Sequence, residues 1–109
     1  MNILYIDTSS NKEITVGIKS GAKKTEVKHN ISVQKAQIVL PLIEKLLNKH
    51  KLKPKDISAI EVETGPGSFT GLRVGISVAN ALSFALGIPI NGKKTNTITL
   101  PIYEPLTKK

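Results

Sequence analysis

Residues 64–76 have the sequence TGPGSFTGLRVGI, a turn rich in glycine and proline that runs directly into an apolar segment ending at Leu86. Tight turns favour glycine and proline, and the apolar segment predicts a helix over about 70–86. Ser68 or Thr70 is expected to cap this helix, and Gly87 is expected to end it. A turn of this kind joins a strand to a helix, so the stretch indicates an α/β fold.

Arg73 is the one charged residue between Thr64 and Gly92, and it is the only arginine of the chain. A guanidinium is planar and can bind a carboxylate through two parallel hydrogen bonds, which a lysine cannot do. We therefore expect Arg73 to bind a carboxylate on a partner. The alternative is chance in a composition whose positive charge comes almost entirely from lysine.

Alternating apolar residues and turn residues predict the other elements. The expected strands are 2–7, 13–19, 24–31, 57–63 and 88–91, and the expected first helix covers 33–50 with Ser32 as its cap. The order is β-β-β-α-β-α-β. Short turns join the first three strands, and one helix connects each later pair of consecutive strands. We therefore expect one α/β domain with a mixed five-stranded sheet.

The composition is that of a small globular protein with one modest core: 109 residues, 39% of them hydrophobic. We expect one domain over 1–97 and a tail over 98–109 that is poorly ordered. The chain has no cysteine, no apolar run of about 20 residues and no leader pattern at its start, which together favour the cytoplasm and exclude disulfides. The formal charge of +8 favours a polyanionic or acidic partner.

Both predicted helices have apolar surfaces wider than one sheet can cover. In 70–86 the apolar side chains occupy more than half of the circumference, whereas docking on a sheet needs a stripe of about 100°. We therefore expect a partner to cover the excess by contacting Ile38, Leu42, Leu72, Arg73, Ile76, Ala79, Asn80 and Ser83. The alternative is that the first helix covers much of this surface within the domain.

Residues 65–75, together with 6–9 and 40–43, resemble the TsaB (YeaZ) family, a bacterial subunit for the threonylcarbamoyladenosine (t6A) modification of transfer RNA. The resemblance covers about residues 1–90, whereas members of the family are about twice as long and have a second lobe. It implies a single ribonuclease H-like lobe of the actin/hexokinase superfamily, the N-terminal one. Lys35 stands where the family usually has a histidine.

The resemblance also implies a function and partners. The family is a non-catalytic paralogue of the TsaD enzyme and is required for its activity, so no catalytic residue and no cofactor are expected here. The implied partner is a TsaD-like catalytic subunit or a second copy of the chain, bound through the two helices. A TsaE-like ATPase could join them, tRNA would be contacted indirectly, and no membrane is involved.

The same resemblance places Asp7, Thr8, Ser9 and Ser10 where superfamily ATPases have their first phosphate loop. Those loops contain Asp-x-Gly, and a β-carbon in place of the glycine obstructs the approach of phosphate. We therefore expect a degenerate loop in which Asp7 and Ser10 organise the turn. The turn 65–67 resembles an anion cradle, but no lysine follows it, which favours a tight turn with glycines at positive φ.

Two other functions stay open at this point. One is an enzyme of the same superfamily that binds and hydrolyses ATP. The other is a basic RNA-binding module that uses the stripe formed by Lys45, Lys49, Lys51, Lys53 and Lys55. A metal site is not expected, because His29 and His50 have no third ligand at a useful spacing.

Overall fold

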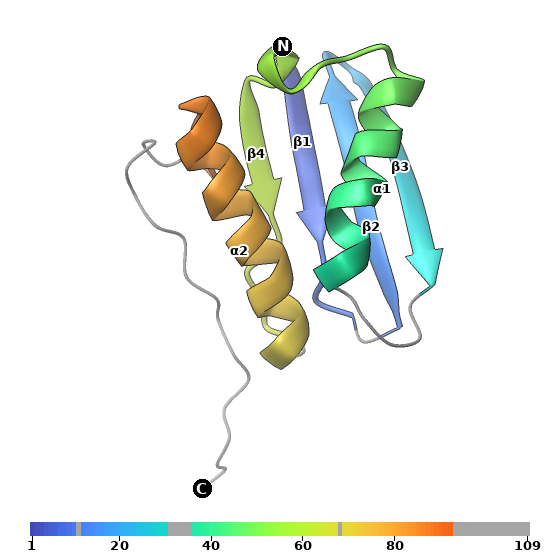
Figure 1. Cartoon of the computed structure of the whole chain (residues 1–109), viewed down its shortest axis with the longest axis vertical. Helices are drawn as coiled ribbons and strands as arrows, with labels where there is room; N and C mark the ends of the chain where they lie inside the picture. The colour runs from blue at the N-terminus through green and yellow to red at the C-terminus, as the bar shows by residue number, and fades with distance from the viewer. Residues whose placement is uncertain (11, 31–35, 68, 93–109) are drawn as a thin grey trace, which may run out of the picture.

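The computed structural model describes residues 1–10, 12–30, 36–67 and 69–92, which form a two-layer α/β structure (Figure 1). The elements are β1 (Asn2–Asp7), β2 (Glu13–Ser20), β3 (Lys23–Asn30), α1 (Ala36–Lys49), the 3-10 turn η1 (Pro54–Asp56), β4 (Ala59–Val62) and α2 (Phe69–Leu86). The sheet has the order β3-β2-β1-β4. The first three strands pair antiparallel, and β4 lies parallel to β1, so the sheet is mixed as expected.

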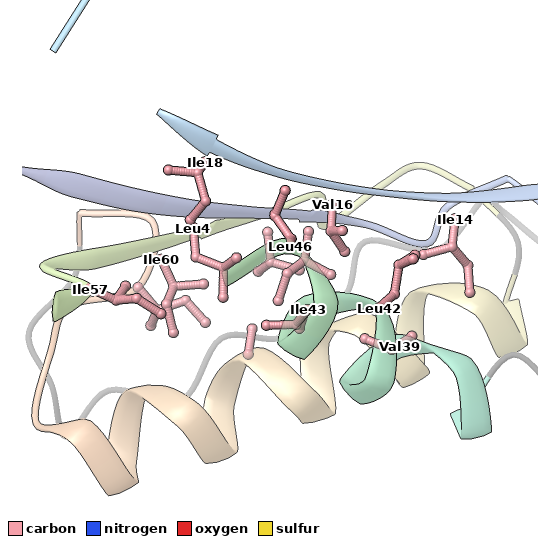
Figure 2. Close-up of a cluster of buried hydrophobic side chains, with 14 of the residues drawn as sticks. Leu4, Ile14, Val16, Ile18, Val39, Leu42, Ile43, Leu46, Ile57 and Ile60 are labelled. Carbon is pink, nitrogen blue, oxygen red and sulfur yellow. The ribbon is translucent and has the colours of Figure 1, made fainter. Parts of the chain in front are cut away.

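Both helices pack on one face of the sheet. Alternation along the strands sends Leu4 and Ile6 of β1 toward the helices, with Val16 of β2 beside them. In Figure 2 the side chains of α1 meet those of β1 and β2 in one continuous cluster. Helix α1 contacts β2, α2 contacts β1 and β4, and the two helices also contact each other. Each large apolar side chain buried here contributes about 1.5–3 kcal/mol.

The predicted fifth strand is replaced by a single bridge. Residues 88–91 pair with β4 only at Ile90, opposite Ile60. Asn91 then adopts a φ of 50°, in the left-handed region, which ends the extended backbone. Its side-chain amide continues the pairing instead: Nδ2 donates to the carbonyl of Val62 (3.0 Å), and the amide N–H of Val62 donates to Oδ1 (2.8 Å). The prediction of five strands is therefore wrong for the described residues, which form four.

The other predicted elements are present with shifted ends. β4 begins at Ala59 rather than at residue 57, because the N–H of Ile57 closes η1 on the carbonyl of Pro54. Helix α2 ends as predicted: Gly87 has a φ of 66°, and the N–H of Ile88 donates to the carbonyl of Ser83 (3.1 Å). The structure does not describe the side chains of the predicted caps, Ser32 and Ser68 or Thr70. The predicted tail 98–109 also lies outside the described residues. None of the described helices is long and apolar enough to cross a membrane.

Candidate functional site

The turn after β1 is organised by its own side chains. Oδ1 of Asp7 accepts hydrogen bonds from the backbone N–H (2.9 Å) and the hydroxyl (2.6 Å) of Ser9. The hydroxyl of Ser10 accepts one from the backbone N–H of Lys12 (3.0 Å). These are the local bonds by which aspartate and serine stabilise turns. The expectation that Asp7 and Ser10 organise this turn is confirmed.

Thr8 of the same turn is inserted against the first turns of α2. Its side chain is only 1% exposed. Oγ1 donates to the carbonyl of Gly71 (2.5 Å) and accepts from the N–H of Gly75 (3.0 Å). Gly71 and Gly75 are four residues apart, so the hydroxyl binds the two backbone groups that an α-helix pairs with each other. The buried hydroxyl is thus used both as donor and as acceptor, as buried polar groups generally are.

Two glycines allow this close approach. A Cβ on Gly75 would overlap the side chain of Thr8, and a Cβ on Gly67 would lie 2.8 Å from Cβ of Ser9. Gly65 has a different requirement, a φ of 115°, which favours glycine. The residues Thr8, Ser9, Gly67, Gly71 and Gly75 therefore form one unit, the strand–helix joint, in which close contacts account for Gly67 and Gly75. The expected positive φ is found at Gly65, whereas Gly67 is a contact position.

Tyr5 lies beside this turn, on the face of the sheet opposite to the helices. Its hydroxyl donates to Oδ2 of Asp7 (3.3 Å), and Nζ of Lys24 lies 5.1 Å from its ring centroid. Burial, followed by the negative charges of Asp7, Glu63 and Glu26, raises the pKa of Tyr5 to about 12. Tyr5 is therefore a neutral donor that fixes the second oxygen of Asp7.

Five of the eight predicted interface residues are buried in the core of the chain itself. Leu42, Leu72, Ile76, Ala79 and Ser83 are all at most 7% exposed. The prediction that these five contact a partner is therefore wrong. The sheet covers one flank of α2 and α1 covers another, which is the alternative stated for this surface. Of the remaining three, Arg73 is exposed, and Ile38 and Asn80 are half-buried.

The helix layer nevertheless leaves apolar side chains uncovered in the described residues. Phe84 of α2 is 78% exposed and Leu40 of α1 is 53% exposed. A groove of about 360 Å³ adjoins Leu40. Its apolar lining comes from α1, the connector before β4, and α2: Leu40, Ile43, Leu47, Leu52, Pro54, Ile57 and Leu82. Surplus apolar surface is thus present, but at positions other than the predicted ones.

The signal for Phe84 is visible in the sequence. On the α2 wheel this residue is the large apolar side chain that falls among Arg73, Ser77 and Asn80, on the polar side. Leu40 gives no comparable signal, because its neighbours Val39 and Ile43 carry the same apolar pattern into the core.

Comparison with known proteins places this arrangement in a family. Residues 29–98 match the family model described as TsaD, tRNA N6-adenosine threonylcarbamoyltransferase. The protein YeaZ from Pseudomonas aeruginosa has the same fold, with a TM-score of 0.77 and 31% sequence identity, over 82% of this chain and 41% of that one. The chain belongs to this family, on its TsaB (YeaZ) branch.

Two relatives illustrate the range of the match. The tRNA threonylcarbamoyladenosine biosynthesis protein TsaB of Bacillus subtilis is 34% identical over 118 residues, which is 95% of this chain and 50% of the relative. The tRNA N6-adenosine threonylcarbamoyltransferase of Ralstonia pickettii is 52% identical over 52 residues, 48% of this chain and 15% of that enzyme. The chain spans about half the length of the TsaB relatives that it matches.

Proposed function

We propose that the chain is a non-catalytic interaction subunit of the t6A machinery that pairs through its helix layer with a TsaD-like catalytic subunit or with a second copy of itself. Membership of the TsaB branch supports a role in t6A biosynthesis, which is what the printed names of its relatives describe. The same membership supports assigning the sheet and its two helices to a ribonuclease H-like lobe of the actin/hexokinase superfamily. A TsaE-like ATPase belongs to this proposal as a third component.

The observation that carries the proposal is the exposed apolar surface of the helix layer. Phe84 of α2 and Leu40 of α1 are exposed, the groove lined by α1, the connector and α2 adjoins Leu40, and Arg73 is exposed on α2. Aromatic residues and arginine are enriched in protein interfaces, where they supply much of the binding energy. Covering Phe84 alone is worth about 2 kcal/mol, and a specific interface buries roughly 1,200 Å² or more.

The strand–helix joint argues against the alternative of an ATPase. A phosphate loop needs backbone amides that are open to a ligand. In this turn Thr8 instead binds α2, Ser9 lies against Gly67 of the turn before α2, and Asp7 accepts bonds from Ser9. Titration calorimetry with ATP tests this point: binding in the micromolar range by the chain alone would favour the enzyme.

A matched pair of substitutions tests the interface. Ala81 is exposed on α2 near Phe84, and Ala22 is exposed in the turn between β2 and β3. We expect Ala81→Glu to weaken association with the TsaD-like subunit or with a second copy at least tenfold, because it places a charge in an apolar contact. Ala22→Glu makes the same chemical change elsewhere and should leave association unchanged.

Light scattering coupled to size exclusion, with each variant alone and with the catalytic subunit, provides the measurement. Thermal unfolding of both variants should match the parent chain, since both positions are on the surface. Equal association of Ala81→Glu and Ala22→Glu would place the interface elsewhere. Substitution at Ile76 or Ala79 would not be informative, because these side chains are part of the core.

A further inference from the structure

Exposed lysines gather at one end of the sheet. Lys19 and Lys23 flank the turn between β2 and β3, Lys49 ends α1, and the connector to β4 carries Lys51, Lys53 and Lys55. We call these six residues the basic end. Figure 1 shows the β2–β3 turn, the end of α1 and the connector at the same end of the sheet as the N-terminus.

Asn2 holds the two lysine-bearing segments together. It pairs with Ser20 across β1 and β2, and its Oδ1 accepts a hydrogen bond from the Ser20 hydroxyl (2.6 Å). Its Nδ2 donates to the carbonyl of Asp56 (3.0 Å), and its own carbonyl accepts from the N–H of Ser58 (2.8 Å). One residue thus contacts both the β2–β3 turn and the connector. Lysines more than twenty-five residues apart in the sequence therefore flank the same strand end.

The charge of the basic end is little compensated within the described residues. The ion pairs Lys24–Glu26 (3.2 Å) and Lys28–Glu13 (3.7 Å) use other lysines. The nearest acid in the sequence, Asp56, accepts a bond from the backbone N–H of Lys53 through Oδ2 (2.8 Å). At the other end of the sheet, by contrast, β1 ends at Asp7, β2 begins at Glu13, and Glu63 follows β4. Among the described residues, carboxylates thus accompany Lys12 and Lys28 at this other end, whereas the basic end has an excess of positive charge.

The side chains at the basic end suit phosphate groups. They are flexible, compact ammonium groups. The six residues of the basic end include neither the arginine fork that pairs with carboxylates or guanine nor an aromatic ring on which a base could stack. Such a surface contacts a nucleic-acid backbone without reading its sequence. We infer that the basic end binds the phosphate backbone of RNA. The choice of RNA, among the possible polyanions, rests on the proposed function. The existence of the basic end rests on the structure alone.

The experiment measures binding of a labelled, unmodified tRNA transcript by the intact chain between 50 and 200 mM KCl, concentrations over which such contacts weaken strongly. Contacts from about four to six lysines predict a slope of log K against log salt of roughly −3 to −5. Lys23→Gln/Lys55→Gln takes one lysine from each segment. This double variant should reduce the slope by about 1.5–2 and weaken binding about tenfold.

The matched control is Lys12→Gln/Lys28→Gln, which removes the same charge at the other end of the sheet and should retain both slope and affinity within about twofold. Lys19→Gln/Lys53→Gln, again one lysine from each segment, should repeat the effect of the first pair. The two test pairs should melt at the temperature of the parent chain, and the control, which breaks the exposed Lys28–Glu13 ion pair (3.7 Å), should melt close to it. Equal losses in the control and in the two test pairs would overturn the inference, because binding would then follow net charge alone.

Competition separates RNA from other anions. Polyglutamate or phosphatidylglycerol vesicles that displace the tRNA at equal charge concentration would overturn the inference in favour of an acidic protein or a lipid surface. The outcome is separable from the proposed function: Ala81→Glu should bind tRNA normally, and Lys23→Gln/Lys55→Gln should associate normally with the catalytic subunit. Loss of RNA binding with intact assembly, or the reverse, identifies which of the two proposals fails.

Discussion

At the scale of single residues, Thr8 and Gly75 are a complementary pair. The hydroxyl of Thr8 binds the backbone of α2, and the missing β-carbon of Gly75 makes room for it. Neither residue is explained by its own segment. A threonine in a turn and a glycine in a helix are each neutral or unfavourable choices locally, and only their contact gives both a purpose.

A double-mutant cycle tests this pair. Thr8→Ala removes the two hydrogen bonds and the packing of a buried hydroxyl and should lower the free energy of unfolding by about 1–3 kcal/mol. Gly75→Ala should cost a similar amount through overlap with Thr8. The double variant removes the overlap with the Thr8 hydroxyl and methyl group, so the loss should be smaller than the sum by at least about 0.5 kcal/mol. Urea denaturation measures all three, and additive losses would mean that the two residues do not interact.

The raised pKa of Tyr5 predicts that the stability of the chain depends on pH in the alkaline range. Its pKa is raised from 10.0 to about 12 in the folded chain, so folding favours the protonated phenol. The resulting stabilisation is fully present below pH 10 and is lost as the pH rises from 10 to 12. The free energy of unfolding of the parent chain should therefore fall more steeply over this interval than that of Tyr5→Phe. Parallel curves for the two proteins would contradict the assignment.

At the scale of elements, β4 shows how a side chain can replace a strand residue. The pairing of residues 88–91 with β4 begins at Ile90 and is continued by the amide of Asn91. Apolar alternation predicts a strand here, but it carries no information on where the backbone turns. Asparagine tolerates the left-handed φ that ends this segment, and its amide offers the same donor and acceptor as a peptide group.

Substitution at Asn91 separates its two roles. Asn91→Gly keeps the left-handed φ and removes the amide, so it should cost about 1–2 kcal/mol and speed exchange of the Val62 amide proton. Asn91→Ala removes the amide and also disfavours the φ, and it should cost more than Asn91→Gly. Hydrogen exchange followed by NMR reports on Val62 directly. Unchanged exchange in both variants would show that the amide of Asn91 does not carry the pairing.

At the scale of the whole molecule, the helix layer and the basic end are two separate surfaces, each available to a different partner. The helix layer exposes Phe84 and Leu40, and the basic end lies where the β2–β3 turn meets the connector before β4. Phosphate contacts weaken with salt, whereas apolar contacts do not. Raising the KCl concentration should therefore release RNA before it disrupts assembly through the helices.

The sequence by itself determined the alternating strands, the two helices, the end of α2 at Gly87 and the importance of the glycine-rich stretch, because periodicity and backbone conformation are local properties. The tertiary structure alone decided the rest. Leu72, Ile76 and Ala79 became core because the sheet and α1 enclose α2, and distant lysines became one surface because Asn2 joins their segments. Burial depends on what packs opposite a side chain, and a helical wheel does not contain that information.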